Sequence, residues 1–262
     1  MRKDITLEEN FFEFVEIVKR LRKECPWDKE QTHESLRRCI LEESYEVLES
    51  IDNNDINELK KELGDVLLQV IFHASIGEEN NSFSLNEVID LEKEKLITRH
   101  PHIFGDVKVS GSEEVKANWE KLKRKEGRQS ILDGVPNELP ALFKAYRIQE
   151  KAAKVGFDWK DPKPVYDKIL EEIGELKHNI ENGLEHKKIE DEFGDVLFSI
   201  VNYARFLKIN PEDALRKTIK KFIYRFKKIE EHAKSNGIKP EDMTLDEMDV
   251  IWNNAKGDIN EK

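Results

Sequence analysis

Cysteine is scarce in this chain of 262 residues, which has only Cys25 and Cys39 and no Cys-x-x-Cys pair. So few thiols exclude a disulfide scaffold and a thiolate zinc site, and they fit a reducing compartment. The sequence also has no apolar run near the roughly 18 residues that a membrane span needs. Its N-terminal stretch is charged throughout and lacks the apolar core of a signal peptide. We therefore expect a cytoplasmic protein without a membrane partner.

Positive charge is outnumbered, with 44 Lys and Arg against 55 Asp and Glu and a net charge of −11. This balance argues against a nucleic-acid surface as the main partner. The sequence contains no Gly-x-x-x-x-Gly-Lys-Ser/Thr phosphate loop, and no serine or cysteine nucleophile can be paired with a histidine. Covalent catalysis is therefore unsupported. An acidic protein can still bind a phosphate compound when it binds metal cations first.

Helical periodicity is the dominant pattern. Apolar residues recur at steps of three or four over 165–180 and again over 189–204, and turn-forming residues lie between the two runs at 179–183. This pattern predicts an antiparallel helical hairpin, and several such hairpins make a bundle. We therefore expect an all-α fold whose core is formed by these apolar stripes.

The same plan occurs twice, because residues 41–74 match residues 170–204 in order and in the placement of their acids. A period of about 130 residues is too long for a solenoid and indicates two tandem copies of one domain. We predict an N-terminal helical-bundle domain over 1–126, a linker over 127–140 that contains Gly and Pro, and a C-terminal helical-bundle domain over 141–262.

Carboxylates recur on one face of each helix in the second hairpin, where Glu172 pairs with Glu175 and Glu192 pairs with Asp195. Four carboxylates on facing helices would repel one another, and one or two divalent cations would offset that repulsion. Ligands that are all oxygen suit Mg²⁺, Mn²⁺ or Ca²⁺ rather than zinc, and we expect Mg²⁺ with Mn²⁺ as a substitute. The corresponding acids of the first hairpin are Glu43, Glu46, Glu62 and Asp65.

Other interpretations of these acids stay open from the residues alone. A single Glu-Glu-x-x-Glu run is usually a solvated helix face, although here it is repeated and the second pair lies within an apolar stripe. A di-iron site would need Glu-x-x-His on two helices, and only Glu175 and His178 form such a pair. Gly64 and Gly194, inside the two acid-bearing helices, suggest close helix approach or a need for room beside the acids.

Basic residues at matching places predict phosphate contacts. Lys221 and Arg225 stand four residues apart on one helix face, and Lys95 and Arg99 repeat the pair in the first half. Such residues could instead merely balance an acidic protein and favour a helix end. Beside a cluster of hard metal ions they would suit a polyphosphate. Metal-assisted hydrolysis would then follow, with a carboxylate positioning or deprotonating the attacking water.

With these residues in view, the chain resembles the MazG family of all-α nucleoside triphosphate pyrophosphohydrolases. The resemblance rests on Glu-Glu-x-x-Glu followed by Glu-x-x-Asp and on the stretches CPWDKEQTHESL, RHPHIFG and KVGFDW, and it covers nearly all of the chain. It implies Mg²⁺-dependent hydrolysis of nucleoside triphosphates, with broad base tolerance, between the α and β phosphates, which gives the monophosphate and pyrophosphate. It also implies a homodimer with intertwined helices and suggests house-cleaning of aberrant nucleotides.

The resemblance implies roles for residues of the second half. The metal ligands would be Glu172, Glu175, Glu192 and Asp195. Glu171 would support the ligand shell or the attacking water. Contacts to the phosphates would come from Lys168, Lys188, Lys221 and Arg225. Trp252 would contribute to the nucleotide pocket.

The first half keeps its acids and its basic pair but departs elsewhere. Cys39 stands where the second half has Lys168, Glu58 where it has Lys188, and Phe72 where it has Asn202. We also expect no tryptophan at the end of the first copy to match the one in the second. Metal binding could survive these changes while triphosphate binding weakens, so we expect the C-terminal half to be the main catalytic domain.

Some expectations concern the family-typical stretches and the choice of function. Trp27 and Phe104 are expected to be packing residues, because no chemical role can be given to the stretches that carry them. Two alternatives to a hydrolase of broad specificity stay open. One is a regulatory scaffold that binds nucleotides or proteins without chemistry, and the other is a narrower dUTP or (p)ppGpp hydrolase.

Overall fold

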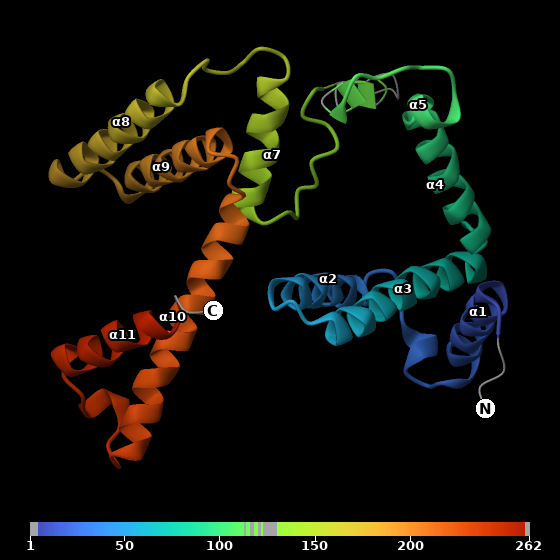
Figure 1. Cartoon of the computed structure of the whole chain (residues 1–262), viewed down its shortest axis with the longest axis horizontal. Coiled ribbons are helices and arrows are strands. Elements are labelled where there is room, and N and C mark those ends of the chain that lie inside the picture. The colour runs from blue at the N-terminus through green and yellow to red at the C-terminus, as the bar shows by residue number, and fades with distance from the viewer. Residues whose placement is uncertain (1–4, 113, 116–117, 120–121, 123–129, 260–262) are drawn as a thin grey trace. The chain divides into compact units, whose positions relative to one another are not determined.

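The computed structural model forms helices and turns and contains no strand among the residues that it describes (Figure 1). Those residues are 5–112, 114–115, 118–119, 122 and 130–259. The chain divides into two compact units, Met1–Lys125 (unit 1) and Glu126–Lys262 (unit 2). The prediction of an all-α chain built from two tandem helical domains is confirmed. Residues 127–129 of the predicted linker lie outside the described residues, and 130–140 form turns that belong to unit 2.

Unit 1 contains five of the described helices and one short 3₁₀ turn. In chain order they are α1 (Leu7–Glu24), η1 (Asp28–Glu30), α2 (Arg37–Asp52), α3 (Ile56–Glu79), α4 (Leu85–Arg99) and α5 (Pro101–Phe104). Local rules set where they begin. Thr6 and Ser84 each accept a hydrogen bond from the backbone of a glutamate three residues on, whose side chain bonds back to the cap, so both helices start with a capping box.

The core of unit 1 lies where α1 packs on α3. Its buried side chains are Val15, Val18, Leu36, Ile71, Phe72 and Ile76. Arg22 is buried beside this core and forms an ion pair with Glu79, with Nη2 2.5 Å from Oε2. The same guanidinium donates to the carbonyl of Gln31 at 3.0 Å, which fixes the connection between α1 and α2. The core residues of the hairpin lie at the start of α2 and in the C-terminal half of α3, whereas its acids stand nearer the turn.

Unit 2 has a similar order of helices around its own hairpin. Its elements are α7 (Ala141–Ala153), α8 (Pro162–Glu181), α9 (His186–Phe206), α10 (Pro211–Ser235), η2 (Pro240–Asp242) and α11 (Leu245–Ile259). Helices α8 and α9 form the predicted hairpin (Figure 1). The turn is shorter than 179–183, because α8 continues to its C-cap Asn182 before Gly183 takes a φ of 62°. The first hairpin turns in the same way through Asn54, with a φ of 54°.

Each hairpin directs much of its apolar surface outward. Ile173 on α8 and Phe193 and Leu197 on α9 are between 41 and 55% exposed, while Val165 and Val196 are buried. The expectation that the apolar stripes form the core is therefore wrong for about half of their members. The reason is that the acids occupy part of the interface between the two helices, so the apolar residues beside them face away from it.

Candidate active site

Three carboxylates of unit 2 meet between α8 and α9. One carboxylate oxygen from each of Glu172, Glu192 and Asp195 lies within 4.8 Å of the other two. Glu172 is only 7% exposed, whereas Asp195 is exposed at the edge of the group. Glu192 and Asp195 share a face of α9 because they stand three residues apart, and Glu172 opposes them from α8. The structure thus brings together three of the four predicted metal ligands.

Two side chains of α8 supply donors to this acidic cluster. The Nζ of Lys168 lies 2.7 Å from Glu171 Oε1 and 2.8 Å from Glu172 Oε1, and these bonds raise the pKa of the lysine. The buried Asn179 donates from Nδ2 to Glu192 Oε1 at 3.2 Å. Hydrogen bonds and a positive charge favour the ionised form of a carboxylate, so both donors offset the repulsion within the cluster.

The remaining predicted acids stand beside the cluster rather than in it. Glu175 is exposed and is not one of the three convergent carboxylates. Desolvation raises its pKa, and the charges of Glu172 and Glu192 raise it further. A cation bound at the cluster would reverse the electrostatic part of that shift, so Glu175 fits the outer edge of a ligand set. Glu171 is exposed and pairs with Lys168.

The donor set fits a hard divalent cation. It consists of oxygen atoms that converge from two rigid helices, with one member buried, and such sets suit Mg²⁺ or Mn²⁺. The di-iron alternative loses its histidine, because His178 lies in the last turn of α8 and its ring Nδ1 is 3.2 Å from Nδ2 of Asn182 rather than at the cluster.

The predicted phosphate-binding residues of the later helices form a separate group. The guanidinium of Arg225 lies 5.4 Å from the ring centroid of Trp252, and Phe222 packs edge-on against the same ring at 5.0 Å. Lys221 is exposed one turn before Arg225. No hydrogen bond or ion pair between described residues joins this group to the acids. Lys188 is exposed in the first turn of α9 and pairs with none of the described carboxylates.

Unit 1 repeats the acidic cluster. Oxygen atoms of Glu43, Glu62 and Asp65 lie within 4.8 Å of one another. Burial raises the pKa of Glu43, and the charges of Asp65 and Glu46 raise it further. The spacing of the acids therefore produces the same convergence in both hairpins, as the internal repeat predicts.

The two units differ in how the repulsion between their clustered carboxylates is offset. Burial and the neighbouring acids Glu46 and Glu58 raise the pKa of Glu62 to about 7. Ser50 stands where unit 2 has Asn179, and its hydroxyl donates to the carbonyl of Glu46 at 2.9 Å rather than to a carboxylate. Unit 1 thus has the same acids but lacks counterparts of Lys168 and Asn179, whose side chains bond to the carboxylates of unit 2.

Unit 1 also contains a basic and aromatic group that the sequence did not predict. Arg99 lies over the ring of Trp119, with 5.8 Å from its guanidinium carbon to the ring centroid, as Arg225 lies over Trp252 in unit 2. The expectation that the first copy lacks a tryptophan counterpart is wrong. The match was hidden because Trp119 follows its arginine by 20 residues and Trp252 follows its own by 27. Both residues of unit 1, with Lys95, line a cavity of about 360 Å³.

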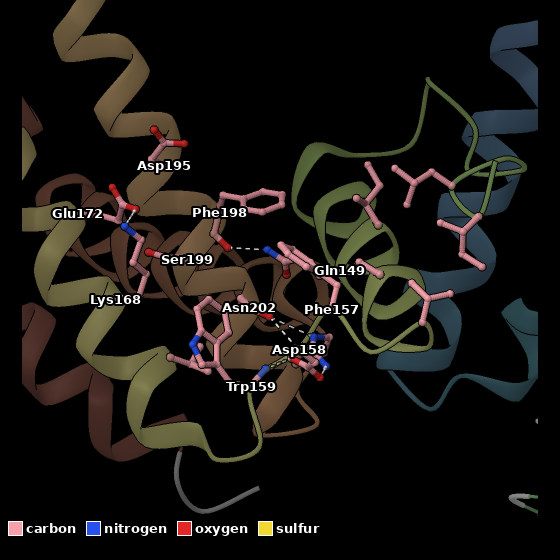
Figure 2. Close-up of a pocket in the computed structure, with 17 residues that line it drawn as sticks. Gln149, Phe157, Asp158, Trp159, Lys168, Glu172, Asp195, Phe198, Ser199 and Asn202 are labelled. Atoms are coloured by element: carbon pink, nitrogen blue, oxygen red, sulfur yellow. Dashed lines mark hydrogen bonds and ion pairs between the residues drawn. The ribbon is translucent and has the colours of Figure 1, made fainter.

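A larger cavity, of about 510 Å³, adjoins the acidic cluster of unit 2 (Figure 2). Lys168, Glu172 and Asp195 line the end of the cavity next to the acids. Most of its remaining wall is apolar and includes Ile148, Val155, Phe157, Trp159, Val165 and Phe198. The part of the wall away from the acids is polar again and is lined by Gln149, Asp158, Asn202 and Arg205. A pocket of this size and character is typical of a small-molecule site.

Comparison with known proteins decides the family. The MazG nucleotide pyrophosphohydrolase domain matches residues 31–104 and 161–229, which include both acidic hairpins. The nucleoside triphosphate pyrophosphohydrolase/pyrophosphatase MazG of Thermotoga maritima is 48% identical over 252 residues, which cover 94% of this chain and 96% of that protein. The nucleoside triphosphate pyrophosphohydrolase of Escherichia coli is 41% identical over 237 residues, 88% of this chain and 90% of that protein.

The chain belongs to the MazG nucleotide pyrophosphohydrolase family. The prediction of an enzyme that hydrolyses phosphoric anhydrides is confirmed at the level of this family. The crystal structure of a MazG-related protein from Thermotoga maritima also matches, at 28% identity and a TM-score of 0.39, and the match covers 43% of this chain and 98% of that one. Among the described residues of this MazG-family chain, no helix is both long and apolar enough to cross a membrane.

Sequence reasoning missed several residues of this MazG-family site. Asn179 could have been found, because it stands seven residues after Glu172 and therefore on the same helix face. The ion pair between Asp158 and Arg205 gave no local signal, since 47 residues separate its members. Phe157 and Trp159 lie in the KVGFDW stretch that marks the family, but nothing in their spacing places them beside the acids.

Two minor expectations are also wrong within the single chain. A Cβ built on Gly64 or Gly194 meets no atom within 4 Å, so neither glycine marks close helix approach, while a need for room beside the acids stays a prediction. Trp27 and Phe104, expected to be packing residues, are 60 and 61% exposed. Their place on the surface of unit 1 means that intramolecular packing does not explain these two family-typical aromatic residues.

The raised pKa of Glu62 predicts a pH dependence of stability in metal-free protein. The folded state holds a proton up to about pH 7, whereas the unfolded chain releases it near 4.5. The stabilising contribution is therefore complete below pH 4.5 and is lost as pH rises through 7. We expect Glu62→Gln to flatten the decline in unfolding free energy between pH 5.5 and 8.5, measured by urea unfolding in EDTA.

Added Mg²⁺ provides the control for that measurement, because a cation at the cluster favours the ionised carboxylate. The wild-type decline should shrink when Mg²⁺ replaces EDTA, and the Glu62→Gln variant should respond less. Equal pH slopes for wild type and variant in EDTA would show that Glu62 titrates as an ordinary glutamate.

Proposed function

We propose that this protein is a Mg²⁺-dependent hydrolase that cleaves nucleoside triphosphates of any base between the α and β phosphates. The products are the nucleoside monophosphate and pyrophosphate, and Mn²⁺ can replace Mg²⁺. The observation that carries the proposal is the junction of the three-carboxylate cluster, the adjoining Lys168 and the apolar cavity in unit 2. A metal site, a cation for phosphate and a wall for an organic group meet there, as a nucleotide requires.

Each residue has a role that follows from its position. Glu172, Glu192 and Asp195 would hold Mg²⁺, with Glu175 at the edge of the set. When bound, the cation supplies positive charge that polarises phosphoryl oxygens and favours ionisation of an attacking water. Lys168 binds a phosphate oxygen once substrate competes for it with the carboxylates. Asn179 orients Glu192 through a hydrogen bond, and Glu171 positions Lys168 through an ion pair.

We also propose that the working form is a homodimer in the cytoplasm. The hairpins expose apolar side chains in number, among them Ile173, Phe193, Leu197 and Ile200 on α8 and α9. A contiguous exposed apolar surface marks an interaction site, and a second copy of the same chain offers a matching one. The exposed apolar residues of α10, such as Phe222, extend the same argument to the tail of unit 2.

Product identification tests the reaction. Incubation with Mg²⁺ and each of ATP, GTP, CTP, UTP and dUTP should yield monophosphate and pyrophosphate, resolved by ion-exchange chromatography. Release of diphosphate with orthophosphate would reject cleavage between the α and β phosphates. Turnover of dUTP or (p)ppGpp alone would replace broad tolerance with a narrow hydrolase, and nucleotide binding without turnover would favour a scaffold.

The division of labour between the units predicts unequal effects of matched substitutions. Glu172→Gln removes a buried ligand and should lower kcat/KM at least about 100-fold, or roughly 2.7 kcal/mol in transition-state stabilisation. Glu43→Gln, the same change at the matching place in unit 1, should cost less than about threefold. Helical circular dichroism checks that both variants fold. Equal losses would show that the two units contribute equally to turnover.

If the protein is a homodimer, its mass in solution should depend on the exposed apolar face of α9. Light scattering of the eluted wild type should give twice the chain mass of 30.8 kDa. Phe193→Asp places a charge on the exposed apolar face of α9 and should shift the mass to one chain. Lys177→Asp, on an exposed polar position of α8, is the matched control and should leave the dimer intact. A dimeric Phe193→Asp variant would exclude this face from the interface.

A further inference from the structure

Three polar residues, Asp158, Asn202 and Arg205, line the cavity of unit 2 at the end away from the acids, and they bond to one another. The carboxylate of Asp158, in the loop between α7 and α8, binds the guanidinium of Arg205 on α9 through two bonds, one of them 2.9 Å between Oδ2 and Nη1. Arg205 in turn donates to Oδ1 of Asn202 from Nε at 3.1 Å and from Nη2 at 2.9 Å. All three residues line the cavity (Figure 2).

This arrangement fixes the orientation of the Asn202 amide. A guanidinium offers donors only, so the atom that faces Arg205 has to be the carbonyl oxygen. The Nδ2 group therefore lies on the opposite side of the amide. Asn202 is only 9% exposed, and its Nδ2 has no hydrogen-bond partner among the described residues. Nδ2 is not one of the fully buried atoms that lack a partner, so it is accessible at the cavity wall and can donate to an acceptor on a ligand there.

The wall of the cavity defines the chemistry of that ligand. Phe157, Trp159 and Phe198 present aromatic surface, which favours a flat apolar group. The other end opens on Lys168 and the acidic cluster, which favours a polyphosphate with its cation. The ligand that joins a flat ring with acceptor atoms to a polyphosphate is a nucleotide, with its base in the cavity.

We propose that Asn202 recognises the base of the substrate by donating from Nδ2 to an acceptor on the ring, and that Asp158 and Arg205 are positioning residues that fix this donor. The proposal rests on the proposed function and extends it to the base. Every nucleobase carries acceptor atoms on its edges, so a single donor discriminates less between bases than a paired donor and acceptor would. Broad base tolerance, as proposed above, would then result from a specific contact to the base and would not require that the protein leaves the base without contacts.

Unit 1 supplies the internal comparison. Its counterparts of Val165 and Asn202 are Leu36 and Phe72, and both belong to the packed hydrophobic core. Ser75 stands in place of Arg205 and donates to the carbonyl of Ile71, so nothing there could orient an amide. The same helical plan therefore has a filled core where unit 2 has a cavity. A cavity at a place where the matching described residues of unit 1 form a packed core indicates a use for it.

The test removes one acceptor atom from adenine at a time. Adenine in a nucleotide offers N1, N3 and N7 as ring acceptors, and the 1-deaza, 3-deaza and 7-deaza analogues of ATP each lack one. We expect wild type to bind one analogue about three- to tenfold more weakly than ATP, the effect of one neutral hydrogen bond. The Asn202→Leu variant should raise KM for ATP by the same factor with kcat unchanged. It should no longer distinguish that analogue from ATP.

Controls separate base recognition from damage to the fold. Inorganic tripolyphosphate has no base, so its inhibition constant against ATP turnover should be equal in wild type and Asn202→Leu. Gln69→Met changes an equally buried amide on α3 of unit 1 and should leave the pattern of the analogues unchanged. Arg205→Met keeps Asn202 but frees its amide, so it should raise KM for ATP and weaken discrimination between ATP and that analogue without changing kcat.

The wild-type measurements alone can overturn the proposal. If all three deaza analogues bind as tightly as ATP, no ring acceptor meets Asn202. Equal loss for ATP and every analogue in Asn202→Leu would make the residue a structural one. Failure of the proposed function is distinguishable, because the analogue series can be read by calorimetric binding. A protein that binds ATP through one ring nitrogen but turns over no nucleotide would keep this inference and lose the hydrolase.

Discussion

The site depends on holding like charges together between two helices. Glu172, Glu192 and Asp195 converge in the α8–α9 hairpin, where their mutual repulsion has to be offset before the hairpin can close. Lys168 and Asn179 offset part of it, and a divalent cation would offset the rest. Because the acids occupy the space between the helices, apolar residues such as Phe193 face outward. The chemistry of the site thus also creates the surface that a second copy can cover.

The two units show that one spacing of acids can serve two environments. Both hairpins converge three carboxylates, but in unit 1 the neighbours of Glu62 are further acids, and its pKa rises to about 7. Unit 1 retains the pairing of a guanidinium with an aromatic ring at Arg99 and Trp119, so it resembles unit 2 there more than the sequence suggested. What it lacks is the cavity, because Phe72 packs into its core. The two halves therefore differ both in this cavity and in the residues that surround the acids.

The sequence predicts what short spacing along one helix controls. Acids three residues apart had to share a face, and Lys168, four residues before Glu172, had to lie near it. The hairpin and the convergence of three carboxylates therefore followed from periodicity. Periodicity does not tell which side of a helix meets its partner, so the outward apolar face was not foreseen. Nor does it reveal contacts across 47 residues, such as that of Asp158 with Arg205, which build the far end of the cavity.

Helix α9 links the two ends of this cavity. Asp195 and Asn202 stand seven residues apart on it, which is two turns and about 10 Å along the axis. A rigid helix keeps that separation constant, and the ion pair of Asp158 with Arg205 ties the aromatic loop to the same helix. A ligand whose ring is anchored at Asn202 can therefore place only a particular part of its phosphate chain at the acids. The same fixed distance would then both position the base and select the anhydride bond that is cleaved, whichever base is present.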